Sequence, residues 1–186
     1  MGNKLVLVTG GARSGKSSFA ESQIKLMGQS IAYIATAQAF DEGMKDRIKK
    51  HIDQRPKEWP TFECYEYLSP EIEAISQKCD VVLLDCITVM VTNLMFLEEK
   101  DWDKLSRNRI NAIEAIILEE ITKLTDALRQ YNLSALLVTN EVGAGIVPEN
   151  KLARVFRDIA GRVNQHLASQ VDEVYFVVSG IPMKIK

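Results

Sequence analysis

The chain has 186 residues, and its 23 lysines and arginines against 25 aspartates and glutamates give a formal net charge of −2. Hydrophobic residues make up 46% and charged residues 26%, a composition typical of globular proteins that argues against disorder or a fibre. The absence of a basic excess argues against a nucleic-acid backbone as the main ligand.

The N-terminal half predicts strands that alternate with helices. Residues 4–9 form a short β-branched run that ends in two glycines, as a buried parallel strand does before a turn. Farther on, Met44, Ile48 and Ile52 recur every four residues and predict a helix over residues 41–54, which Pro56 ends. The other elements expected in this half are a helix at 17–26, a strand at 30–35, a strand at 61–65, a short helix at 70–77 and a strand at 81–84.

The C-terminal half continues the alternation. Residues 87–97 are mostly apolar but include Thr88, Thr92 and Asn93, which leaves a helix and an irregular segment both open. The later elements are an amphipathic helix at 107–129, a strand at 133–139, a glycine-rich loop at 140–150, a helix at 151–168 and a strand at 174–178. This order predicts one three-layer α/β domain over residues 1–186, with a mostly parallel central sheet and ligands beyond the carboxyl ends of the strands.

Location and redox chemistry follow from what the sequence lacks. Its apolar runs are too short for a membrane span, and residues 1–10 lead straight into glycines rather than into a secretory signal, so we expect a cytoplasmic protein. Cys64, Cys79 and Cys86 form no C-x-x-C pair and predict neither a zinc site nor a disulfide framework.

The strongest motif runs from Gly10 to Ser17, GGARSGKS, which matches the phosphate-binding loop G-x-x-x-x-G-K-[ST]. It follows a predicted strand and precedes a predicted helix, as this loop requires. Its glycines permit close backbone approach to a phosphate, and the helix N-terminus directs N–H groups at it. Lys16 is placed to reach the β and γ oxygens, and Ser17 to ligate Mg²⁺.

Asp85 is the expected second Mg²⁺ contact, because it follows a buried strand and shares the ligand-binding edge of the sheet. The alternative is a capping or turn aspartate.

His51 has two interpretations. On the predicted helix it lies one turn from Arg47 and one turn from Arg55, so the row could face a phosphate chain with a neutral, nucleophilic imidazole. On pattern alone, a solvated surface histidine is the commoner case.

Eight sequence blocks carry a resemblance that extends over nearly the whole chain. They are GGARSGKS at 10–17, ATA at 35–37, RIKKH at 47–51, DCIT at 85–88, VTNL at 91–94, VTNEVG at 138–143, IVPEN at 146–150 and RDIAGRVNQ at 157–165. In this order they resemble the bifunctional adenosylcobinamide kinase / adenosylcobinamide-phosphate guanylyltransferase family of cobalamin biosynthesis.

The resemblance implies a RecA-like P-loop NTPase fold, usually a homotrimer, that acts twice on one substrate. ATP or GTP first phosphorylates adenosylcobinamide. A histidine then takes GMP from GTP, releases pyrophosphate and passes GMP to adenosylcobinamide phosphate, which yields adenosylcobinamide-GDP.

The resemblance also assigns roles to residues. The family's nucleophilic histidine matches His51. Matching the blocks places nucleotide contacts at Gly10, Gly11, Ala12, Arg13, Ser14, Gly15, Lys16, Ser17, Ala35, Thr36, Ala37, Ile52, Asp53, Gln54, Arg55, Glu63 and Asp85.

Two other functions compete with this one. A P-loop kinase of another small metabolite would leave His51 idle. A GTP-binding switch is disfavoured because Thr139-Asn140-Glu141-Val142 lacks the lysine and aspartate of the guanine-reading N-K-x-D block.

Overall fold

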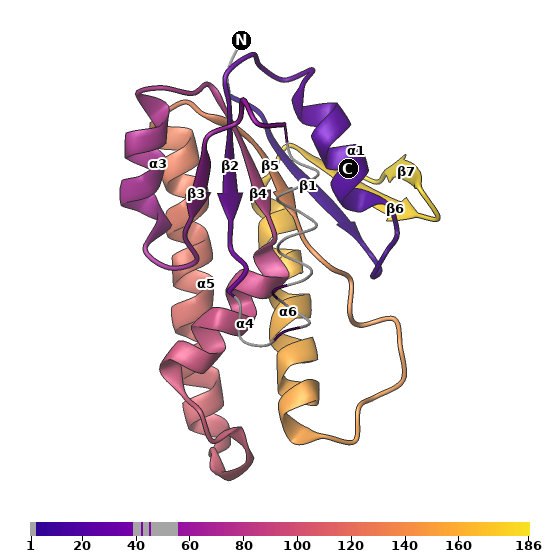
Figure 1. Ribbon diagram of the computed structural model, residues 1–186. Helices are drawn as coiled ribbons and strands as arrows, with labels where there is room; N and C mark the ends of the chain where they lie inside the picture. The colour runs from indigo at the N-terminus through magenta and orange to yellow at the C-terminus, as the bar shows by residue number, and fades with distance from the viewer. Residues whose placement is uncertain (1–2, 39–41, 43–44, 46–55) are drawn as a thin grey trace.

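The computed structural model describes residues 3–38, 42, 45 and 56–186. Figure 1 shows a central sheet with helices on both of its faces. The sheet has seven strands in the order β3-β2-β4-β5-β1-β6-β7, and only its last pair, β6 with β7, is antiparallel. The predicted three-layer α/β fold with a mostly parallel sheet is therefore confirmed.

The elements follow the predicted order. The strands are β1 (Leu5–Gly10), β2 (Ile31–Ala35), β3 (Thr61–Glu63), β4 (Val81–Asp85), β5 (Ser134–Val138), β6 (Glu173–Val178) and β7 (Ile181–Lys184). The helices are α1 (Lys16–Ile24), α3 (Leu68–Ser76), α4 (Ile87–Glu98), α5 (Arg107–Gln130) and α6 (Lys151–Gln170), with a 3-10 turn at Trp102–Lys104. The helix predicted over 41–54 lies outside the described residues except at positions 42 and 45.

The two faces of the sheet carry separate parts of the core. Leu5 and Leu7 of β1 belong to a buried cluster with α3, α4, α5 and α6, whereas Val6 and Val8 belong to one with α1. Successive side chains of a strand point to opposite faces, so a continuous apolar run buries both.

The structure settles the open segment at 87–97, which is helix α4. Most of its residues are buried, Met90, Leu94 and Met95 among them. A helix buried on several sides shows no apolar stripe, and the sequence pattern therefore could not identify it.

The strand β7 was not predicted. It follows the turn at Ser179 and Gly180 and lies at the edge of the sheet, paired only with β6. Pro182 within it argues against a central strand but is compatible with an edge, where the missing N–H costs no ladder hydrogen bond.

No helix within the described ranges is both long and apolar enough to cross a bilayer.

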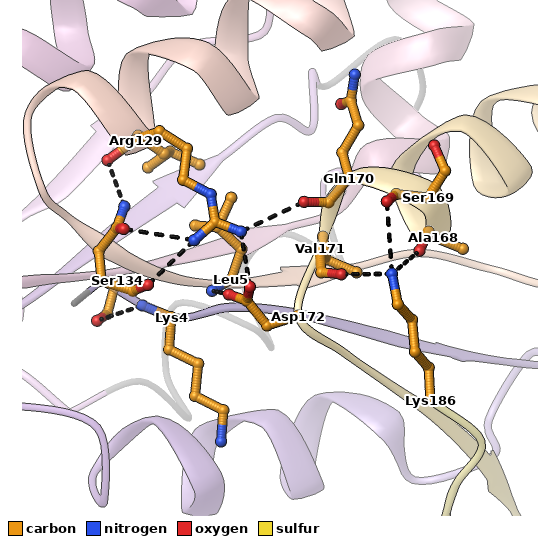
Figure 2. Close-up of polar contacts among 12 residues, drawn as sticks. Lys4, Leu5, Arg129, Ser134, Ala168, Ser169, Gln170, Val171, Asp172 and Lys186 are labelled. Atoms are coloured by element: carbon orange, nitrogen blue, oxygen red, sulfur yellow. Dashed lines mark hydrogen bonds and ion pairs between the residues drawn. The ribbon is translucent and has the colours of Figure 1, made fainter. Parts of the chain in front are cut away.

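A cluster of polar side chains holds the chain segments together at the end of the sheet where β1 begins (Figure 2). Arg129, near the end of α5, donates to the Asp172 carboxylate over 2.9 Å and to the carbonyl oxygen of Gln170 over 3.3 Å. The other oxygen of Asp172 accepts the Leu5 N–H over 2.7 Å. Nearby, the Lys186 ammonium donates to the carbonyl oxygens that end α6, as cations favour at a helix C-terminus.

We expect Asp172→Asn to lower the free energy of unfolding by about 1 kcal/mol, since one donor at this site loses its acceptor and the pair is partly exposed. Burial alone would raise the pKa of Asp172, but hydrogen bonds from Arg129 and from the Leu5 N–H outweigh it and lower that pKa. A lowered pKa stabilises the fold above the ordinary carboxyl range, and this contribution is lost as the pH falls.

Urea unfolding at several pH values measures this effect. The difference between wild type and Asp172→Asn should be present at pH 7 and shrink below about pH 4. Asp126→Asn, at an exposed position of α5, is the control and should show neither effect. A difference that stays constant down to pH 3 would contradict the assigned role of the ionised carboxylate.

Candidate active site

The phosphate-loop motif joins β1 to α1, and its two defining glycines have steric reasons. A side chain at Gly10 would place its Cβ 2.5 Å from the carbonyl oxygen of Val177. Gly15 has a φ of 92°, and its Cβ would lie 3.0 Å from the Cα of Gly180. The loop is therefore packed against the β6–β7 turn in a shape that these two positions tolerate only as glycine.

The side chains of the loop are poised for an anion. Lys16 is only 8% exposed, and its ammonium donates to the carbonyl oxygen of Gly11 over 3.2 Å. Burial lowers the pKa of Lys16, while Asp85 opposes this shift. The hydroxyl of Ser14 is buried and has no hydrogen-bond partner among the described residues. A phosphate at this loop would supply both the counter-charge and the missing acceptor.

Asp85 lies two strands from the phosphate loop, because β5 is inserted between β1 and β4. With strands ~4.8 Å apart, this separation is about 10 Å between the two strand backbones. The Asp85 carboxylate accepts a hydrogen bond from the Tyr33 hydroxyl over 3.2 Å. The sequence pattern alone does not identify Tyr33 as a site residue, because its only signal is a hydroxyl inside an otherwise apolar strand.

Three predicted nucleotide contacts form one row across neighbouring strands. Ala35 at the end of β2 is in register with Asp85 of β4 and with Glu63 of β3. Glu63 lies four strand intervals from β1, which is roughly 19 Å. Glu63 and the loop therefore cannot contact the same phosphate group, whereas Asp85 lies between them at the carboxyl ends of the strands.

The residue after Ala35 ties this row together. The hydroxyl of Thr36 donates to the carbonyl oxygen of Cys86 over 2.8 Å and accepts the Cys86 N–H over 2.9 Å. Ala37 is half-buried beside it. The residues that follow β2 and β4 are thus hydrogen-bonded to each other next to Asp85.

Ser17 and Asp85 are the residues that would hold Mg²⁺. Both offer oxygen atoms, the ligands that Mg²⁺ prefers, and both are partly accessible. The described part of the chain contains no group of three histidine, cysteine or acidic residues that could hold a metal ion alone. This donor set fits Mg²⁺ bound through one or two protein oxygens, water and substrate phosphates.

The remaining predicted residues divide into two groups. Ala12 and Arg13 are exposed at the tip of the phosphate loop, and Gly11 is half-buried there. His51, Ile52, Asp53, Gln54 and Arg55 lie outside the described residues, so their predicted roles stay predictions.

The surroundings of Cys86, next to Asp85, disfavour a nucleophilic thiolate. Burial raises the pKa of its thiol to about 12, with the Asp85 charge acting in the same direction. The thiol therefore stays protonated near neutral pH.

Comparison with known proteins extends the likeness over the whole chain. The family described as "Cobinamide kinase / cobinamide phosphate guanyltransferase" matches residues 6–185. The "Bifunctional adenosylcobalamin biosynthesis protein CobU" of Salmonella typhimurium (strain LT2) is 51% identical over 98% of this chain and 99% of the relative. The protein of the same name from Escherichia coli (strain K12) is 49% identical over the same shares. The "Bifunctional adenosylcobalamin biosynthesis protein CobP" of Pseudomonas aeruginosa is 35% identical over 97% of this chain and 96% of the relative.

Proposed function

The chain belongs to the cobinamide kinase / cobinamide phosphate guanyltransferase family and is a bifunctional enzyme of this kind, and from this premise we propose how its residues divide the two reactions. Adenosylcobinamide is phosphorylated first, with ATP or GTP as donor. GTP then supplies GMP, and the product is adenosylcobinamide-GDP.

The phosphate loop performs the first reaction. Its backbone N–H groups and Lys16 bind the β and γ phosphates and stabilise the charge that builds up as the γ-phosphoryl group moves to the substrate hydroxyl. Mg²⁺ held by Ser17 and Asp85 would neutralise further phosphate charge. The observation that carries this assignment is the packed loop itself. Positions 10 and 15 have no room for a side chain, and the Lys16 side chain is buried.

His51 performs the second reaction. Its neutral imidazole nitrogen attacks the α-phosphorus of GTP, and the bond to the bridging oxygen breaks, so that pyrophosphate leaves with that electron pair. A phosphate oxygen of the corrinoid then attacks the same phosphorus, and the phosphorus–nitrogen bond breaks to return the imidazole. Arg55 and the other contacts assigned from 52 to 55 would bind the nucleotide during this exchange, together with Ala35, Thr36, Ala37 and Glu63.

The direct test supplies the purified enzyme with adenosylcobinamide, GTP and Mg²⁺ and follows the products by mass spectrometry. Adenosylcobinamide phosphate should appear first and adenosylcobinamide-GDP second, with ATP able to support only the first product. A phosphorylated product from another metabolite, with none from adenosylcobinamide, would favour the alternative of a different small-molecule kinase.

Asp85→Asn should raise the Mg²⁺ concentration that half-activates the kinase reaction, because the amide keeps the volume of the side chain but removes its charge. A Mg²⁺ titration of initial rates measures the shift. Asp80→Asn, at an exposed position just before β4, is the control for loss of one carboxylate. If the Asp85→Asn curve coincides with that of wild type, Asp85 is a turn residue with no part in metal binding.

The homotrimer implied by the resemblance is part of the same proposal. The apolar stretch at 87–97 gives it little support, because α4 buries most of that stretch within its own chain. Exposed apolar side chains remain at Leu97 near the end of α4 and, outside that stretch, at Ile146, Ile181 and Ile185. Sedimentation at micromolar concentration should give three times the chain mass, and a monomer would exclude the trimer.

We also keep the predicted cytoplasmic location, since both reactions consume nucleoside triphosphates.

A further inference from the structure

Four residues at the carboxyl ends of β4 and β5 form a closed ring of hydrogen bonds. The Asn140 N–H and the Thr88 hydroxyl lie 2.6 Å apart, and the Thr88 and Thr139 hydroxyls 3.1 Å apart. The Thr139 hydroxyl lies 2.7 Å from Asn164 Oδ1, and Asn164 Nδ2 lies 3.0 Å from the carbonyl oxygen of Asn140. We call these four residues the hydroxyl–amide ring.

Hydrogen-bonding capacity fixes the direction of every bond in the ring. Asn164 Oδ1 is only an acceptor, so the Thr139 hydroxyl donates to it and uses its single hydrogen. The Thr88 hydroxyl must therefore donate to Thr139, and it accepts from the Asn140 N–H. Asn164 Nδ2 closes the ring by donating to Asn140. Since each hydroxyl donates once and accepts once, removal of one member leaves its neighbours unsatisfied.

The ring joins the phosphate loop to the strand that carries Asp85. Thr88 is three residues after Asp85, in the first turn of α4. On the other side, the Thr139 N–H donates to the carbonyl oxygen of Val8 over 2.9 Å, and the Glu141 N–H donates to that of Gly10 over 3.0 Å. The segment that leaves β5 is thus bonded to the beginning of the phosphate loop and, through the ring, to α4.

Burial and a contact from helix α6 also hold the ring in place. Thr88 and Thr139 are buried, with exposed fractions of 6% and 1%. Asn164 belongs to α6, which together with α4 extends beyond the carboxyl ends of the strands in Figure 1. Asn140 and Asn164 are half-buried. The two buried hydroxyls hold the ring in place, because displacing either would leave a buried polar atom without a partner.

We propose that the hydroxyl–amide ring is a positioning device for the reaction, with Thr139 and Asn164 as its positioning residues. It holds the phosphate loop and Asp85 at the separation at which both act on one bound nucleotide. The inference rests on the proposed function, to which it adds residues that touch no substrate.

The test compares Thr139→Val, which removes the hydroxyl at nearly constant volume, with two controls. Thr139→Ser keeps the hydroxyl and should restore the ring. Thr125→Val removes another buried hydroxyl, which donates to Gln170 over 2.7 Å between α5 and α6. It matches the loss of a buried hydrogen bond without touching the ring.

Two kinds of readout are taken. Amide hydrogen exchange of the free enzyme should be faster at Asn140 and Glu141 in Thr139→Val than in wild type, and unchanged there in both controls. In steady-state phosphorylation, kcat of Thr139→Val should fall by about 10²-fold with little change in KM for the corrinoid, as expected for a small misplacement of catalytic groups. Thr139→Ser and Thr125→Val should keep the wild-type kcat.

A double variant separates positioning from general damage. If the ring acts through Asp85, the loss caused by Thr139→Val should be much smaller in an Asp85→Asn background, so the two effects are not multiplicative. Multiplicative losses, or a Thr139→Val enzyme with the kinetics and exchange of Thr125→Val, would overturn the inference. Failure of wild type to phosphorylate adenosylcobinamide would instead refute the proposed function, and the exchange comparison would still test the ring.

Discussion

Replacing Lys16 by alanine should lower the rate of adenosylcobinamide phosphorylation by about 10²- to 10³-fold, the usual cost of removing one preorganised charge stabiliser. The transition state spreads negative charge over the phosphoryl oxygens, and the enzyme contributes mainly position and charge. Lys16 lies at the start of α1, and its buried side chain is held beside the loop by the hydrogen bond to the Gly11 carbonyl oxygen.

Initial rates at saturating nucleotide and Mg²⁺ measure this loss. Lys25→Ala, at the exposed end of the same helix, is the matched control and should keep the wild-type rate. Thermal unfolding of Lys16→Ala verifies that the fold persists. An unchanged rate in a folded Lys16→Ala enzyme would refute the assignment of the phosphate loop.

Replacing His51 by alanine should separate the two activities. Guanylyl transfer should fall by several orders of magnitude, because the covalent acceptor of GMP is lost. Phosphorylation should persist, since Lys16, Ser17 and Asp85 remain. The enzyme would then accumulate adenosylcobinamide phosphate and stop there.

The second histidine of the chain provides the matched control. His166 on α6 contacts the Thr122 hydroxyl of α5 over 2.8 Å and the amide of Gln170 over 3.1 Å, away from the phosphate loop. His166→Ala should keep both activities. If His51→Ala makes adenosylcobinamide-GDP at the wild-type rate, another residue is the nucleophile and His51 is a solvated surface histidine.

The sequence predicted the parts of the fold that depend on local patterns. The β-branched run before Gly10 and the three- and four-residue spacing within α5 each specify an element without reference to the rest of the chain. Helix α4 and strand β7 were not specified in this way. The first is apolar on several sides because of its neighbours, and the second contains Pro182, which only an edge position tolerates.

The candidate site could likewise be predicted only in part. The phosphate loop is contiguous, so residues 10–17 could be identified from spacing alone. The distance between that loop and Asp85 could not be predicted in this way. It depends on β5, which begins about fifty residues after Asp85 and lies in the sheet between β1 and β4. The hydroxyl–amide ring combines residues from α4, α6 and the segment after β5, and only the tertiary structure brings them together.

The proposed covalent step is tested most directly with GTP labelled at the α-phosphate. Wild-type enzyme incubated with this GTP and Mg²⁺, then denatured, should retain label on the peptide that contains His51. The label should survive alkali and be lost in acid, as a phosphorus–nitrogen bond requires, and His51→Ala should take up none. Absence of stable label in wild type, label that is lost in alkali, or undiminished label in His51→Ala would contradict the guanylyl-histidine mechanism.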